Sequence, residues 1–134
     1  MDTILWEKEY VLGYENLDEQ HKSIIELYND IAIRATNGFN TSMIINSVKN
    51  LLDYAQMDFS TEERLMILNN YPNFKSHRNE HDFFIRRVEE YLDLLEVDYD
   101  SVAVEMIYFM REWITNHFLN SDKELVSELP NLEN

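Results

Sequence analysis

The sequence predicts an all-α protein, an up-down-up-down antiparallel four-helix bundle with an N-terminal arm and a short C-terminal helix. First, its 134 residues, 45% hydrophobic and 28% charged, suit a single globular domain that covers residues 1–134. Second, only 2 Gly and 2 Pro occur, so the chain has few residues that interrupt helices. Third, apolar residues recur at helical spacing in four segments with short links, which favours antiparallel packing of neighbouring helices.

The N-terminal half should hold an arm and two helices. Residues 1–16 are expected to lie against the body of the bundle as the arm. The first helix is expected at about 17–37, and Gly38 ends it because glycine readily adopts the left-handed conformation of a helix C-terminus. The second helix is expected at about 41–69, after a polar residue such as Asn40 that can cap its first turn.

The C-terminal half should hold two more long helices and a short one. The third helix is expected at about 73–96, with Pro72 opening its first turn, where the missing N–H of proline does no harm. The fourth helix is expected at about 101–119. A short helix, at about 122–129, should then lead to Pro130.

The composition excludes several classes of function. The formal net charge of −15 argues against nucleic acid and anionic membrane surfaces as partners, because their phosphates would repel the protein. Cysteine is absent, which excludes disulfides, iron–sulfur clusters and thiol catalysis and agrees with a cytoplasmic location. The apolar runs are too short to span a bilayer, and we recognise no signal peptide, phosphate-binding glycine loop or Ser-His-Asp signature.

Polar side chains interrupt the apolar stripe of every expected long helix. They are His21, Asp58, Glu62, His77, His81 and His117. Burying a carboxylate without a partner is strongly unfavourable, so this many polar groups facing one core need a common source of compensation. A pair of metal ions would provide it. Nitrogen and oxygen ligands without sulfur suit iron, manganese or zinc.

The spacing of these residues also favours a metal site. His77 and His81 stand four residues apart, so both imidazoles project from one helical face and can hold one ion. Asp58 and Glu62 have the same spacing. One such pair often arises by chance on an exposed helix, whereas several pairs on separate inward stripes are stronger evidence.

Asp122 allows two interpretations. It follows His117 by five residues, about 140° around an ideal helix, so the two side chains share a face only if the helix ends or widens between them. The alternative is that Asp122 caps the N-terminus of the short last helix. The spacing alone leaves both open.

Taken in order, these residues resemble the hemerythrin family in its bacterial single-domain form. The matching pieces are Trp6, Tyr10 and Gly13, then residues 17–22, 59–66, Tyr71-Pro72, 77–81 and 113–118, and finally Asp122. The resemblance implies the four-helix bundle and two non-haem iron ions with an oxo or hydroxo bridge. It also implies reversible binding of O2.

The resemblance implies a role for each site residue. One iron would be held by three histidines: His77, His81 and His117. Glu62 and Asp122 would bridge both irons, which favours the ligand interpretation of Asp122 over the cap. His21 would belong to the second iron. The residues implied to line the O2 pocket are Phe59, Trp113, Ile114 and Phe118.

One position departs from the family pattern. The family has a histidine ligand of the second iron directly before the residue that matches Phe59, and this chain has Asp58. The aspartate could bind the iron directly, bind through a water, or turn away. An anionic ligand favours Fe(III) over Fe(II), so we expect faster autoxidation than with histidine. The alternative is a tolerated, water-bound replacement with ordinary O2 binding.

The expected function is therefore oxygen binding, for transport, storage or sensing, with O2 or peroxide as the partner. No side chain outside the metal ligands suggests an acid or base, so we assign no catalytic residue and favour a binding protein over an enzyme. A di-iron oxidase, peroxidase or ferroxidase-like enzyme is the alternative, with an unspecified electron donor. A non-catalytic iron-binding protein is the third possibility. We expect a monomer or weak oligomer.

Overall fold

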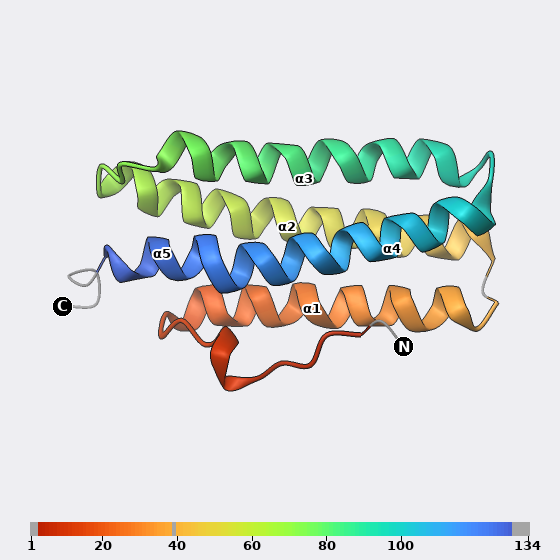
Figure 1. Cartoon of the computed structure of the whole chain (residues 1–134), viewed down its shortest axis with the longest axis horizontal. Coiled ribbons are helices and arrows are strands. Elements are labelled where there is room, and N and C mark those ends of the chain that lie inside the picture. Colours follow the sequence, from red (N-terminus) through yellow and green to blue (C-terminus); the bar gives the residue numbers. More distant parts are fainter. Residues whose placement is uncertain (1–2, 39, 130–134) are drawn as a thin grey trace.

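Four long helices, each antiparallel to its neighbours in sequence, form the bundle in the computed structural model, which describes residues 3–38 and 40–129 (Figure 1). The helices are α1 (Glu15–Thr36), α2 (Thr41–Leu68), α3 (Phe74–Leu95) and α4 (Tyr99–Asn116). α1 packs against α2 and α4, and α3 packs against the same two helices, which closes the ring. The up-down-up-down fold predicted from the apolar stripes is thus confirmed.

The arm lies along α1, as predicted, and is tied to it by hydrogen bonds (Figure 1). The Ile4 N–H donates to the side-chain oxygen of Asn29 at 2.7 Å, and the Asn29 amide donates back to the Ile4 carbonyl at 2.8 Å. A 3-10 turn, Lys8–Tyr10, follows. Gly13 has a positive φ of 92°, and its N–H donates to Asp18 at 3.1 Å, so the arm is fixed at both ends.

The signals at the helix ends agree with the structure, with one exception. The Asn40 side chain accepts a hydrogen bond from the Met43 N–H at 2.9 Å and caps α2, and Gly38 follows α1 in the left-handed region with φ 79°. Pro72, however, does not open α3. The chain is still reversing direction at Asn70, where φ is 52°, so the helix begins two residues after the proline.

The end of α4 differs from the predicted boundary near residue 119. The chain continues without a break through a π-helix, η2 (His117–Ser121), into α5 (Asp122–Ser127). Asp122 has helical angles, φ −73° and ψ −34°, whereas a capping residue has extended backbone. The interpretation of Asp122 as a helix cap is therefore wrong, and the helix widens instead.

The polar residues lie in a layer near the end of the bundle that contains η2. A large apolar core fills the rest of the bundle and reaches Phe59 on α2 and Phe118 on η2. A smaller apolar cluster, with Met66 and Leu125, closes the end beyond the polar layer. The layer is therefore covered by apolar side chains on both sides. In the parts of the chain that the structure describes, no helix is long and apolar enough to cross a membrane.

Candidate metal centre

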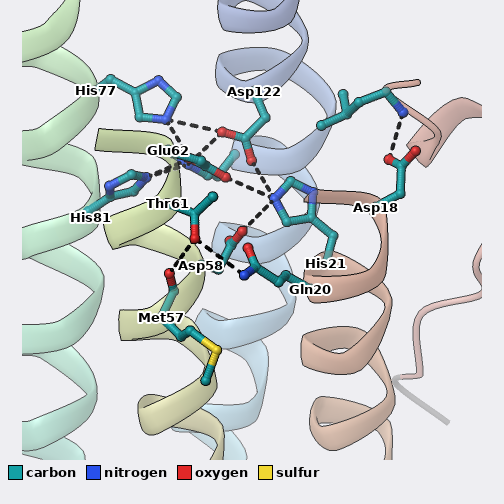
Figure 2. Close-up of polar contacts among 12 residues, drawn as sticks. Asp18, Gln20, His21, Met57, Asp58, Thr61, Glu62, His77, His81 and Asp122 are labelled. Atoms are coloured by element: carbon teal, nitrogen blue, oxygen red, sulfur yellow. Dashed lines mark hydrogen bonds and ion pairs between the residues drawn. The ribbon is translucent and has the colours of Figure 1, made fainter. Parts of the chain in front are cut away.

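All seven residues predicted as ligands meet in this polar layer. Each has a relative exposure of 3% or less: His21, Asp58, Glu62, His77, His81, His117 and Asp122. They come from α1, α2, α3 and the segment that runs from η2 into α5. Figure 2 shows carboxylates and imidazoles of different helices pointing toward one another. The structure therefore joins residues that are far apart in the sequence into one buried cluster.

Three histidines surround one oxygen of Glu62. The Nε2 atoms of His77 and His81 each lie 3.0 Å from Glu62 Oε1, and Nε2 of His117 lies 3.7 Å away. Asp122 approaches the same group, with Oδ1 at 3.1 Å from the Nε2 atoms of His77 and His117. Three imidazoles and two carboxylates therefore converge on one small volume.

The fourth histidine lies on the other side of the same carboxylates. Nε2 of His21 is 2.9 Å from Glu62 Oε2 and 3.2 Å from Asp122 Oδ2. Asp58 points into the cluster, with Oδ1 at 3.2 Å from the same nitrogen (Figure 2). Glu62 and Asp122 thus each turn one oxygen toward the three-histidine group and the other toward His21, which is the placement of bridging carboxylates.

The π-helix explains how His117 and Asp122 reach the same centre. The Asp122 N–H donates to the carbonyl of His117, five residues earlier, where an α-helix would pair residues four apart. The wider turn brings the side chains to 3.1 Å of each other. This confirms the geometric condition that the five-residue spacing imposed on a shared site.

Two carboxylates that the sequence analysis missed hold the histidine rings from outside. Nδ1 of His81 lies 2.9 Å from Glu63, and Nδ1 of His117 lies 2.7 Å from Glu80. Ser121 donates a second hydrogen bond to Glu80 at 2.6 Å, and the bond from His117 lowers the pKa of Glu80 to about 2 despite partial burial. A proton on Nδ1 leaves the Nε2 lone pair facing the centre, as in carboxylate–histidine–metal arrangements.

Aromatic rings cover the imidazoles. Phe59 stacks on His81 with ring centroids 3.9 Å apart, and Phe118 stacks on His21 at the same distance. Trp113 stacks on the ring of His117 at 4.4 Å, and the fourth residue of the predicted pocket, Ile114, is fully buried in the core. These rings restrict how the histidines can rotate. Their role in lining an O2 pocket stays a prediction.

Without cations the cluster binds protons. Burial alone would lower the pKa of His77, but the carboxylates of Asp122 and Glu62, which lie 3.1 and 3.0 Å from its Nε2 atom, raise it to about 9. Burial and then the negative charge of Glu62 raise the pKa of Asp58 to about 8. Burial would also raise the pKa of Glu62, yet the surrounding imidazoles hold it well below its ordinary value. Positive charge is therefore favoured at this centre.

The unpaired atoms of the cluster fit metal ions. Both carboxylate oxygens of Asp58 and of Asp122 are buried without a hydrogen-bond partner among the described residues. Nε2 of His81 lies 3.1 Å from Nε2 of His117, and since the Nδ1 atom of each ring faces a carboxylate, two neutral rings would turn their Nε2 lone pairs toward each other. A cation between these donors would give the buried carboxylate oxygens a partner and would bind both imidazole nitrogens. The donors form two groups that share Glu62, which suits two ions.

Comparisons with known proteins agree with this geometry. Residues 12–129 match the family described as the hemerythrin HHE cation binding domain. A bacteriohemerythrin of Clostridium acetobutylicum is 32% identical, with 91% of this chain and 98% of that protein covered. A bacteriohemerythrin of Pseudomonas aeruginosa is also 32% identical, over 91% of this chain and 78% of that protein. A crystal structure of wild-type hemerythrin superimposes with a TM-score of 0.84 at 28% identity, covering 94% of this chain and 97% of that chain.

Proposed function

Since the chain belongs to the hemerythrin family, we propose that it holds two non-haem iron ions in the bundle core and binds O2 there, for transport, storage or sensing. One observation carries this proposal. Four imidazoles and three carboxylates meet in a buried layer, and two of the carboxylates each face both histidine groups. This donor set suits a pair of iron ions.

Each residue has a role in this proposal. The three-histidine position is held by imidazoles that surround Glu62 Oε1: His77, His81 and His117. Glu62 and Asp122 contribute one oxygen to each position, and His21 with Asp58 completes the second, which we name the Asp58 position. Bound iron would supply the electrons that O2 accepts when it binds.

The protein itself supplies a dry and rigid site. Phe59 and Phe118 lie on one side of the polar layer and Met66 and Leu125 on the other, so bulk water has little access to the ions. Excluding water strengthens the electrostatic interactions inside the site and slows side reactions of bound O2.

Iron loading with an absorption spectrum tests the proposal. The protein is loaded with Fe(II) without air, the bound iron is counted, and visible spectra are recorded before O2 is added, after addition and after removal. We expect two irons per chain and an absorption band that forms with O2 and disappears when O2 is removed. Fewer than two irons, or a spectrum that O2 leaves unchanged, would contradict the proposed function.

Asp58 should shorten the lifetime of the oxygenated protein. Its carboxylate lies 3.2 Å from the nitrogen of His21, within the second metal position, and its negative charge stabilises Fe(III) over Fe(II). We expect the oxygenated form of Asp58→His to persist longer than that of the native chain, as measured by decay of its absorption band in air. Asp53→His, the same change at an exposed position on α2, is the control.

A redox enzyme is the second candidate, and Asp58 is the observation that favours it. A position with one imidazole and several carboxylates resembles oxidising di-iron centres more than a position with two imidazoles. Continuous O2 consumption by the loaded protein with excess Fe(II) or ascorbate would support this function. Binding of one O2 per chain without further consumption would support the binding protein, and one firmly bound iron per chain a non-catalytic iron-binding protein.

A further inference from the structure

We propose that the two positions select different metals, so that the three-histidine position takes iron while the Asp58 position accepts Mn(II). This rests on the proposed function in one respect, that the centre holds two ions. The inference comes from the unequal donor sets of the two positions.

The numbers of nitrogen donors differ between the positions. One position offers three imidazoles with oxygens of Glu62 and Asp122, whereas the other offers the single imidazole of His21 with oxygens of Asp58 and the same two carboxylates. Imidazole suits iron, and carboxylate suits manganese. Fe(II) binds more tightly than Mn(II) to most sites, but we expect this advantage to shrink where oxygen donors replace nitrogen.

The outer hydrogen bonds increase the difference. At the three-histidine position, Glu63 and Glu80 accept protons from the rings of His81 and His117, which makes their Nε2 atoms stronger ligands. His21 has no such support, because its Nδ1 is buried without a hydrogen-bond partner among the described residues. The one nitrogen of the Asp58 position is therefore also a weak one.

Asp58 supplies oxygen donors to compensate. The residue is fully buried and points into the cluster, and neither of its carboxylate oxygens has a hydrogen-bond partner in the described part of the chain (Figure 2). Oδ1 faces the Nε2 atom of His21 at 3.2 Å, so an ion placed between them would have both atoms as ligands. Together the donors form an oxygen-rich position next to a nitrogen-rich one.

A competition experiment tests the preference. Metal-free protein is incubated without air with equal, saturating amounts of Fe(II) and Mn(II), freed of unbound metal, and analysed for both elements. Anomalous diffraction at the iron and manganese absorption edges then locates each metal in crystals. We expect iron at the three-histidine position and a higher ratio of manganese to iron at the Asp58 position.

The other outcomes separate this inference from the proposed function. Two irons per chain, two manganese ions, or the same mixture at both positions would overturn the metal preference and leave a two-metal centre standing. Fewer than two metals in total, with Fe(II) alone as well as with the mixture, would overturn both.

Variants at one position show whether Asp58 carries the preference. Asp58→His adds a nitrogen donor, so we expect the manganese content of the Asp58 position to fall. Removing an outer hydrogen-bond partner already lowers metal affinity by about tenfold or more, and we expect a fall of about tenfold for this change of ligand. Asp58→Asn keeps the volume and removes the charge, and it should lose manganese while the other position keeps iron. Asp53→His should leave the ratio unchanged. An unchanged ratio in both Asp58 variants would overturn the role of this residue.

Discussion

Glu80 connects the three-histidine group to solvent. Its side chain is 40% exposed, yet it accepts hydrogen bonds from His117 at 2.7 Å and from Ser121 at 2.6 Å. The carboxylate thus fixes the ring orientation and the proton position of a proposed ligand without touching the centre itself.

Glu80→Gln should weaken iron binding and leave the fold intact. The amide keeps the shape but removes the charge that strengthens His117 as a ligand, so we expect roughly tenfold lower affinity for Fe(II). A chelator competition titration measures this, with circular dichroism as the check on folding. Glu89→Gln, at an exposed position of the same helix, is the control. Unchanged affinity would show that the hydrogen bond does not matter for binding.

The buried ligands could be predicted from the sequence because they interrupt apolar stripes that would otherwise be continuous. Glu63 and Glu80 could not be predicted, because each directly precedes or follows a ligand on its helix and has the pattern of a solvated surface charge. The direction in which the Asp58 side chain points could not be predicted from the sequence either. It depends on the packing of α2 against α1, which brings His21 to 3.2 Å.

The helices themselves could largely be predicted from periodicity and capping residues such as Asn40 and Gly38, since these signals are local. The continuous run from α4 through η2 into α5 could not. A π-turn has no distinctive local sequence signal. The sequence indicated this one only through the five-residue spacing of His117 and Asp122, which does not place two side chains on one face of an ideal α-helix. Only the demand for a common site made the wide turn plausible.

Insertion and deletion in η2 should have opposite effects. Deleting Asn120, which is exposed, leaves the two positions four residues apart, so a regular α-helix would still bring Asp122 to the face of His117. Inserting one alanine after Asn120 should rotate Asp122 by about 100° away from the centre. We expect the deletion variant to keep two irons and the insertion variant to hold at most one, as measured by metal analysis. Two irons in the insertion variant would exclude Asp122 as a ligand.

The seven buried polar residues make the bundle sensitive to pH and to metal. The pKa of His77 rises from its ordinary value of 6.5 to about 9 in the folded protein, and the pKa of Asp58 rises from 3.8 to about 8. Both groups hold their protons more tightly in the folded state than in the unfolded state. Their contribution to stability is therefore lost as pH increases, for His77 between 6.5 and about 9 and for Asp58 between 3.8 and about 8.

The metal-free protein should accordingly become less stable between about pH 6 and pH 9. The loaded protein should resist this loss, because metal ions replace the protons and bind more tightly when protons compete less. Thermal unfolding of both forms across this range measures the effect. We expect the difference in midpoint between loaded and metal-free protein to widen as pH increases. A constant difference would argue against protonation of the cluster in the metal-free state.

The donors lie on α1, α2, α3 and the segment that continues α4, and this placement has a consequence for motion. His21 lies near the start of α1, whereas Asp122 follows η2 near the end of the described chain, and their side chains meet at 3.2 Å. Ions held by α1, α2, α3 and the α4–α5 segment would act as cross-links between all of them. No helix could then move away from the others without losing a ligand. Separation of the helices and release of the metals would become a single cooperative event, and the residence time of the ions would be set by the opening rate of the bundle.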